Sequence, residues 1–415
     1  MGHPSPAVPR RQRPVLRGVL IKLNTYDDTV RAVNGLTARW AGASSGGSAC
    51  SGAGVWPLLA LLADGAHGPA RAELARALGV PAEHAAQVAR ELLGLMAGIE
   101  GLDSAIGLWT GRTLEPREEW TARLPADTHH ALTGDPAIDQ GELDAWAAKR
   151  TGGLIERMPV EVRETTQLVL ASALALRTTW LRPFEERPVR PSAGPWRGRT
   201  LRGLHRRSVR LDRVGVAALP DGRVTEVKVR GGNGIDVHLL LGDEHMTPGQ
   251  VVGAGTAVLA GGLPVVRGAL LPHGPAGPGL RVEERPCATP QQPTLELTTT
   301  AFEVRAHHDL LRPHSLFGLT TARDTRQGHF PGISPAPLAV GAAQQSVLAR
   351  FDALGFESAA VTAVAAAPGG APPAPRYMAT VVTATFDRPF GFLAVHRESG
   401  LVLTAGWVTE PAPAR

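Results

Sequence analysis

The sequence predicts a single large α+β domain, in which helices come first along the chain and strands follow. Up to about residue 158, apolar residues recur mostly at the three- and four-residue spacing of amphipathic helices. From Gln167 onward the apolar runs shorten to strand length. Helices and strands do not alternate strictly along the chain, which favours an α+β architecture over a parallel α/β sheet.

The same patterns predict the individual elements. The continuous apolar run over residues 167–176 is typical of a central strand that is covered on both faces. We expect helices over residues 25–42, 54–80 (two helices with a break between them), 81–99, 141–151 and 308–319. We expect strands over residues 102–111, 167–176, 209–220, 224–231, 234–242, 294–306, 390–397 and 401–408. The last two strands form a hairpin with Gly400 in its turn.

Composition indicates a folded, mildly basic protein. The 415 residues are 43% hydrophobic and 20% charged, which is enough to bury a large core and argues against global disorder. The net charge is +5, and the densest basic segment, residues 187–210, is interpreted as a surface loop and hairpin. Binding of a polyanion by this segment stays open. The two cysteines, Cys50 and Cys287, make neither a disulfide framework nor a metal motif, and we expect Cys50 to be a buried free thiol.

No apolar run reaches the length of about 18 residues that a membrane-spanning helix needs, so we expect no contact with a membrane. Residues 1–24 are interpreted as a flexible basic arm, and we recognise no secretory signal in them. The mild charge bias does not demand nucleic acid as a partner.

Few residues suggest enzymatic chemistry. Ser44 lies in a Gly-x-Ser-x-Gly pattern, but the segment before it reads as a helix, whereas a nucleophile elbow needs a strand there. The adjacent pairs His129–His130 and His307–His308 would point to opposite sides of a strand, and no carboxylate stands at ligand spacing. Phosphate-loop and dinucleotide motifs are missing. We therefore expect no metal, no cofactor and no enzymatic activity.

One bland segment, "GFESAAVTAVAAAPGG" at residues 355–370, comes just before the last two strands. As a strand it would carry Phe356 followed by only small, uncharged side chains on one face, because side chains alternate between faces. Such a face could be buried without burying a charge. The alternative interpretation is an Ala/Pro-rich linker.

The neighbouring sequence favours the first interpretation, because several motifs together resemble the serpin family, of bacterial type. The family's hinge pattern of Gly, any residue, Glu, small residues and Thr-Ala is matched by "GFESAAVTA" at residues 355–363. Other matching segments, which extend the resemblance over residues 25–412, are "CSGAGVWPLLALLADGAHGPARAELARALG", "WAAKRTGGLIERM", "LVLASALALRTTWLRPFEE", "HFPGIS" and "FDRPFGFLAVHRESGLVLTAGWVTEP".

The resemblance implies a serpin fold: three β-sheets, eight or nine helices, and an exposed reactive-centre loop that we assign with its hinge to residues 353–385. It also implies an inhibitor of serine endopeptidases. A protease attacks the loop, the cut loop inserts into the central sheet as a new strand, and the covalent acyl-enzyme is trapped. We expect a monomer that is extracellular by resemblance, although its localisation stays open.

The resemblance assigns roles to particular residues. The hinge comprises Gly355, Phe356, Glu357, Ser358, Ala359, Ala360 and Thr362, and residues at the opening and under the centre of the sheet are Trp180, Ser51, Ser172 and Gln345. Gln345 aligns with a family histidine and can both donate and accept a hydrogen bond. Ala353 replaces a family acidic residue, and Phe356 replaces a small one, so we expect overpacking by Phe356 to slow insertion.

Two further predictions concern the target. The family's spacing puts the scissile bond at Gly369–Gly370, with Arg376, Tyr377 and Met378 as alternatives. The first choice suits elastase-like or subtilisin-like proteases, and Arg376 would suit trypsin-like ones. The alternative function is that of a non-inhibitory serpin-fold binding protein, in which Phe356 impedes insertion.

Overall fold

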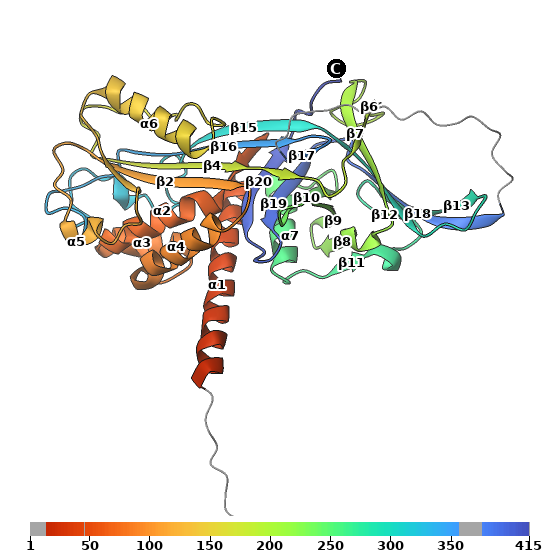
Figure 1. Ribbon diagram of the computed structural model, residues 1–415, viewed down its shortest axis with the longest axis horizontal. Helices are drawn as coiled ribbons and strands as arrows, with labels where there is room; N and C mark the ends of the chain where they lie inside the picture. Colours follow the sequence, from red (N-terminus) through yellow and green to blue (C-terminus); the bar gives the residue numbers. More distant parts are fainter. Residues whose placement is uncertain (1–13, 45, 357–375, 415) are drawn as a thin grey trace, which may run out of the picture.

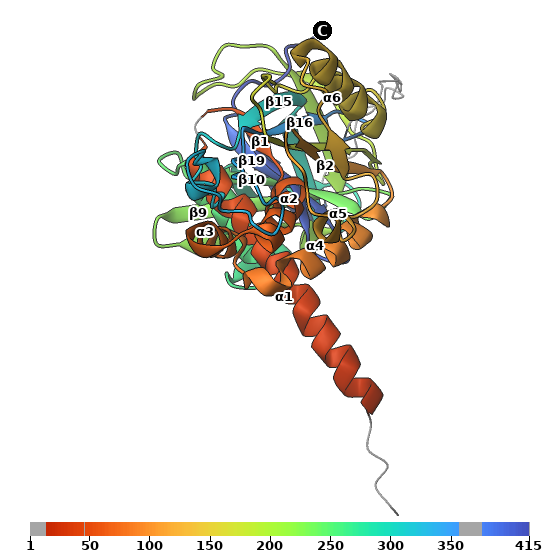
Figure 2. The same ribbon diagram turned by 90° about the vertical axis from the view of Figure 1, so that its left-hand side faces the viewer.

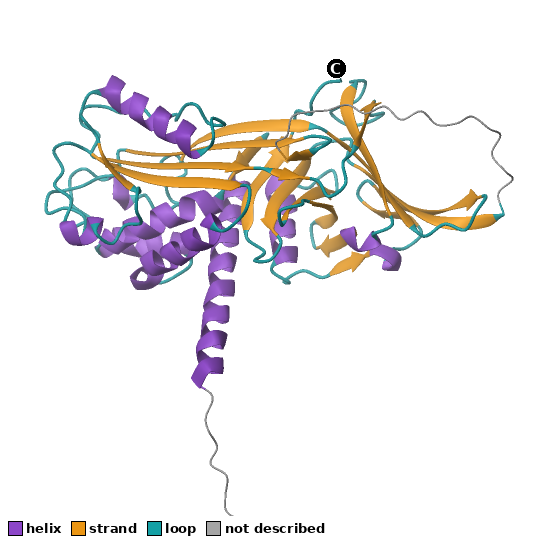
Figure 3. Ribbon diagram, viewed as in Figure 1, coloured by secondary structure: helices purple, strands orange, loops and turns teal. Residues whose placement is uncertain are grey.

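The computed structural model describes residues 14–44, 46–356 and 376–414, with side chains from Asp27 onward. Seven α-helices and three sheets make up these residues (Figures 1 and 3). The helices are α1 (Pro14–Ala43), α2 (Gly52–Gly65), α3 (Gly68–Leu78), α4 (Ala82–Ala97), α5 (Glu118–Thr121), α6 (Pro136–Arg150) and α7 (Pro248–Leu259).

The long sheet has the order β3 (His129–Ala131), β2 (Leu102–Thr110), β4 (Leu168–Leu176), β16 (Ala342–Phe351), β17 (Gly355–Phe356) and β5 (Thr178–Thr179), with β15 (Phe302–Asp309) also paired to β16. The core sheet has the order β1 (Ser48–Cys50), β20 (Val402–Val408), β19 (Phe390–His396), β10 (Ile235–Gly242), β9 (Gly222–Arg230), β8 (Val214–Leu219) and β11 (Val265–Arg267). The curved sheet has the order β12 (Gly274–Gly277), β13 (Leu280–Cys287), β18 (Tyr377–Thr385), β14 (Thr294–Thr300), β7 (Leu201–Ser208) and β6 (Glu185–Val189).

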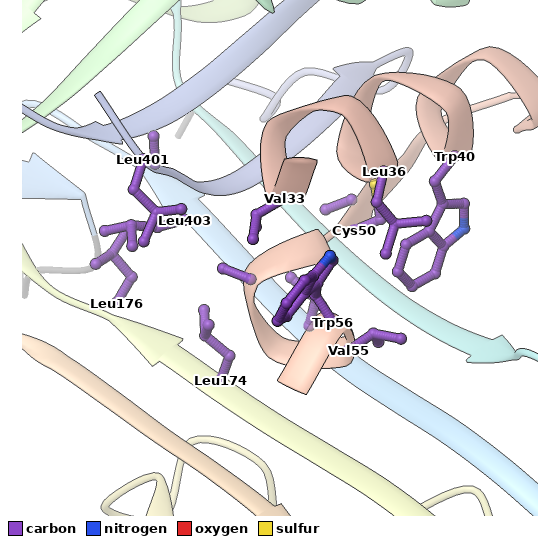
Figure 4. Close-up of a cluster of buried hydrophobic side chains, with 14 of the residues drawn as sticks. Val33, Leu36, Trp40, Cys50, Val55, Trp56, Leu174, Leu176, Leu401 and Leu403 are labelled. Carbon is purple, nitrogen blue, oxygen red and sulfur yellow. The ribbon is translucent and has the colours of Figure 1, made fainter. Parts of the chain in front are cut away.

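Helices cover the long sheet on both faces, with α2, α3 and α4 on one side and α6 on the other (Figure 1). Local sequence begins these helices: the Ser51 hydroxyl accepts from the Gly54 amide at the start of α2, and Asp135 accepts two amides at the start of α6. The main core lies between the long sheet, the core sheet and the N-terminal helices. Figure 4 shows Leu36 and Trp40 of α1 facing Trp56 of α2, beside Leu174 and Leu403 from the two sheets.

Several sequence predictions are confirmed. Strand β4 is buried at all nine positions, as its unbroken apolar run indicates. The hairpin β19–β20 forms, and Gly400 adopts a φ of 70° in its turn, a conformation that favours glycine. The basic segment 187–210 contributes to the antiparallel pair β6–β7 of the curved sheet. Cys50 is a buried free thiol, and burial raises its pKa to about 12.

Other predictions were wrong. Residues 14–24 are helical rather than a flexible arm, because the apolar spacing of α1 continues back to Pro14, and α1 projects from the body in both views (Figures 1 and 2). In the predicted helix 308–319, residues 308–309 end strand β15 and residues 310–318 form turns, since Pro313 interrupts a helix there. Of the predicted loop 353–385, residues 377–385 are strand β18. No helix within the described part of the chain is long and apolar enough to cross a membrane.

Shortening Leu36 tests the packing of α1 on α2. Leu36 is fully buried, so Leu36→Ala should destabilise the protein by about 2–5 kcal/mol and lower its melting temperature by several degrees. Ile138→Ala on α6 is the matched control, because Ile138 is 52% exposed and should change stability by less than about 0.5 kcal/mol. Equal melting shifts for the two variants in thermal unfolding would contradict this packing.

Candidate functional site

The long sheet is only partly closed between its two central strands. Strands β4 and β16 run parallel and pair from Val169–Ala342 up to Leu174–Val347, where their ladder ends. Beyond this point the two-residue strand β17 lies between β16 and β5 and runs antiparallel to both. The chain that leaves β16 therefore turns back into the gap and already occupies the first positions of a strand there.

A buried turn directs the chain into this gap. One Asp352 carboxylate oxygen accepts hydrogen bonds from the amides of Leu354 and Gly355, at 2.9 and 3.1 Å. The Trp180 indole N–H donates to the Asp352 carbonyl at 2.9 Å, and the Trp180 amide donates to Leu354 O at 2.9 Å. Ala353 stands where the resemblance to serpins leads us to expect a carboxylate. Asp352, one residue earlier, supplies one, and its position ahead of a Leu-Gly turn is the signal that was missed.

Phe356 is already buried at the mouth of the sheet. Its side chain is 1% exposed, and its ring centre lies 6.2 Å from that of Phe392. Next to it in the sheet, Phe351 stacks on Phe302 and contacts Trp180, with ring centres 5.3 and 4.8 Å apart. The folded protein therefore already provides a pocket for the Phe356 ring, and the expected slowing of insertion by Phe356 stays a prediction.

Three predicted residues come together under the centre of the long sheet. Ser51, Ser172 and Gln345 are fully buried. The Gln345 amide oxygen accepts from the Ser51 amide and its nitrogen donates to the Ser51 carbonyl, both at 2.9 Å, while the Ser172 hydroxyl lies 3.5 Å from that nitrogen. The Ser51 hydroxyl donates to Leu403 O at 2.6 Å. This polar cluster thus ties α2 to β4, β16 and β20.

Gly54 leaves the space that the polar cluster needs. A Cβ atom at this position would lie 2.6 Å from the Ser172 hydroxyl oxygen and 3.1 Å from the Gln345 side-chain nitrogen. The helix backbone of α2 therefore packs directly against the cluster, and a side chain at residue 54 would push the sheet and the helix apart.

The loop is anchored differently at its two ends. Glu357, Ser358, Ala359, Ala360, Thr362 and the predicted bond Gly369–Gly370 lie outside the described residues. At the far end, the Arg376 amide donates to Cys287 O at 3.0 Å, and Met378 lies within β18 opposite Pro286. The alternative bait residues Arg376 and Met378 are thus at or inside a strand of the curved sheet.

Sequence reasoning missed the hairpin β12–β13. Strand β13 pairs with β18 over eight residue pairs, from Leu280–Ala384 to Cys287–Tyr377, and β14 pairs with the other side of β18 from Val381 onward. The alternation in residues 280–287 is a local strand signal, but its partner is about 100 residues away in sequence.

The other candidates are not assembled into sites. The Ser44 hydroxyl donates to Trp40 O at the end of α1. His307 contacts the Ser346 hydroxyl and His308 contacts Ala49 O, on opposite faces of β15 as adjacent residues must. The residues that the structure describes contain no group of three or more side chains suited to a metal ion.

Comparisons with known proteins agree with this geometry. A family profile described as "Serpin (serine protease inhibitor)" matches residues 36–193. Putative serpin-Z6A of Oryza sativa subsp. japonica is 33% identical over 145 residues, and putative serpin-Z6C of the same plant is 26% identical over 420 residues. These matches cover 32% and 92% of this chain. The chain spans only about a third of the length of Z6A (37%) and of serpin-ZXA (36%), but 97% of Z6C.

Solved structures show the same fold. The thermophilic serpin tengpin in its native state has a TM-score of 0.70 at 15% identity, with 94% of both chains covered. Native protease nexin-1 with heparin (0.68, 16%) and the thyroxine-binding globulin complex with thyroxine (0.67, 15%) each cover 94% of this chain and are themselves wholly covered. The three sheets and the mixed α+β architecture are therefore those of the serpin fold. The named curated relatives are rice proteins, so the expected bacterial type is not supported.

Removing the polar side chain of Gln345 tests the cluster. Gln345→Leu leaves the buried Ser51 amide and carbonyl without their partner, at a cost of about 1–3 kcal/mol for each group, so the melting temperature should fall. Gln345→His, which keeps a donor and an acceptor, should lose less. Gln344→Leu, one position along β16 and half-buried on its other face, is the control and should melt close to the wild type. A Gln345→Leu variant as stable as this control would contradict the cluster's role.

Proposed function

We propose that this chain is a serpin that inhibits a serine protease by suicide-substrate trapping, with residues 357–375 as the bait; the serpin profile over residues 36–193 and the shared fold support this proposal. The protease serine attacks a loop carbonyl, the peptide bond breaks, and the new amino end leaves while the carbonyl stays on the serine as an ester. The freed loop then adds to the long sheet, and the attached protease is carried with it. The chain acts once per protease instead of turning over as an enzyme.

The register of the long sheet carries this proposal. Phe356 is opposite Phe351 on one side and Thr178 on the other. If the strand continued in the same antiparallel register for six more residues, Thr362 would lie opposite Gln345 on one side and opposite Ser172 on the other. Gln345 and Ser172 are themselves partners in the β4–β16 ladder. A strand that continues from β17 is therefore in register with both neighbours at once.

Side-chain size agrees with the register. In an extended strand, Thr362 lies on the same face as Phe356, and that face looks toward the polar cluster. Between Phe356 and Thr362, this face carries Ser358 and Ala360, whose side chains are small enough to pass beneath the covering helix α2. The Thr362 hydroxyl would meet Gln345 and Ser172, so the inserted strand brings its own polar partner to a buried polar site.

Insertion would be driven by strand pairing that the intact molecule does not make. Insertion replaces one parallel ladder, over residues 169–174 and 342–347, by two antiparallel ladders on a new central strand. The uncut loop is held back because its far end is fixed in β18. The native state is then kinetically stable rather than the most stable arrangement.

The bond Gly369–Gly370 is the proposed scissile bond. A protease binds its substrate as an extended strand with free backbone groups, and the alternatives at Arg376 and Met378 have backbone groups engaged with β13. The small residues around Gly369 suit elastase-like or subtilisin-like enzymes. We propose that the inhibitor acts as a monomer.

Mixing the protein with subtilisin, elastase or trypsin tests the proposal. A covalent complex that survives SDS is expected on a gel with at least one of them, and mass analysis of the released peptide should give the cut at Gly369–Gly370. Nicking the loop should raise the melting temperature substantially, because the inserted strand adds hydrogen bonds and burial. Cleavage with no complex and no rise in melting temperature would overturn the inhibitory mechanism.

A second candidate function is that of a non-inhibitory binding protein. The observation in its favour is the tight anchoring of the hinge by Phe356, and one structure of the same fold is described as a complex with thyroxine.

The variant Phe356→Thr separates the two candidates. If the bulky side chain impedes insertion, this variant should trap a larger fraction of protease than the wild type. If Phe356 is a native anchor, removing its ring leaves a cavity and lowers the melting temperature of the intact chain by several degrees, with no gain in trapping. Densitometry of complex and cleaved bands, together with thermal unfolding, distinguishes these results.

A further inference from the structure

A groove of about 490 Å³ lies on the outer face of the curved sheet. Its floor includes Ala379 and Val381 of β18, and its walls carry arginines from three separate parts of the chain, Arg182, Arg207 and Arg285. The opposite face of this sheet is covered by the core, where Val282, Leu295 and Val382 are buried. The groove is therefore a surface feature built across strands β13, β18, β14 and β7.

The two ends of this groove adjoin the two ends of the loop. Arg182 comes three residues after β5, the strand that pairs with β17 where the loop begins. At the other end, Cys287 lines the groove, and its carbonyl accepts from the Arg376 amide where the loop ends. Both segments that flank residues 357–375 in the sequence therefore lie at this groove.

Positive charge exceeds negative charge along the groove. The one carboxylate that lines it, Glu296, is shared by Arg207 at 2.5 Å and Arg285 at 2.8 Å, and Arg285 also lies 3.8 Å from Glu283 of β13. Among the residues whose positions are described, neither Arg182 nor its neighbour Arg206 has a carboxylate within 4.0 Å. Arg206 lies over the Phe184 ring, 4.4 Å from its centre, where burial and the charges of Arg213 and Arg182 lower its pKa to about 10.

Like charges held together without a counter-charge repel one another, and an approaching anionic surface relieves that repulsion. We propose that this groove is a second contact surface for the target protease, which selects enzymes with carboxylates beside their substrate cleft. The inference rests on the proposed function, since it identifies the occupant as the protease that the loop engages. Exposed charges at the edge of an interface, such as these arginines, act chiefly on the rate of association between the two proteins.

The test measures how fast each protease consumes intact inhibitor, counting trapped and cleaved chains together. Arg182→Glu is the main variant, because it removes no ion pair among the described residues, and Arg182→Glu/Arg207→Glu extends it. Arg312→Glu is the matched control: Arg312 is 87% exposed and Arg207 is 79% exposed, but Arg312 lies in a different pocket. Subtilisin, elastase and trypsin are compared at about 0.05 M and about 0.5 M NaCl.

At low salt, a protease whose surface around the substrate cleft is net acidic should consume the double variant about tenfold more slowly than the wild type. A protease whose surface there is net basic should consume the double variant faster than the wild type. At high salt the difference should shrink to less than about twofold. Equal loss in Arg312→Glu, or rate changes that do not follow the rim charge, would overturn the proposal. The proposal would also be overturned if the variants bound more weakly to a dextran sulfate column while their rates of consumption by proteases stayed unchanged. That result would identify the groove as a polyanion site. The trapped fraction is read separately, so a failure to trap reports on the proposed function alone.

Discussion

The decisive constraint in this molecule is the agreement of register across the gap in the long sheet. Strands β4 and β16 pair with each other only as far as Leu174 and Val347, and β17 is already aligned with both of their extensions. Because strand pairing allows only steps of whole residues, an incoming strand that matched one neighbour and missed the other would turn its side chains to the wrong face. In the intact protein, the first two residues of such a strand, Gly355 and Phe356, are already paired with both neighbours.

The surrounding polar groups serve this geometry. Asp352 closes the turn that aims the chain into the gap, and Trp180 holds the same turn from β5. Deeper in the sheet, the Gln345 side chain satisfies the backbone amide and carbonyl of Ser51, at the point where the proposed insertion would separate the strands. Hydrogen bonds between such groups can be exchanged for others, whereas an interlocked apolar core would have to be repacked.

Sequence alone predicts those parts of this fold whose signal is local. The unbroken apolar run of β4, the terminal hairpin and the polar residues Ser51, Ser172 and Gln345 follow from periodicity or from motif resemblance. The burial of Phe356 could not be predicted, because its pocket is made by Phe392 and neighbours from distant strands. The same holds for the groove arginines Arg182, Arg207 and Arg285: only Arg207 lies in the basic segment 187–210, and tertiary packing brings the three together.

The hairpin β12–β13 makes the hold on the two halves of the loop unequal. Strand β18 has β13 along one side and β14 along part of the other, whereas β17 grips the sheet through only two residues. If the loop between them is cut, as we propose, the downstream fragment stays paired within the curved sheet. The upstream fragment keeps the two-residue pairing of β17, next to the gap between β4 and β16. Under the proposed mechanism, this unequal anchorage decides which fragment moves, independently of the final gain in stability.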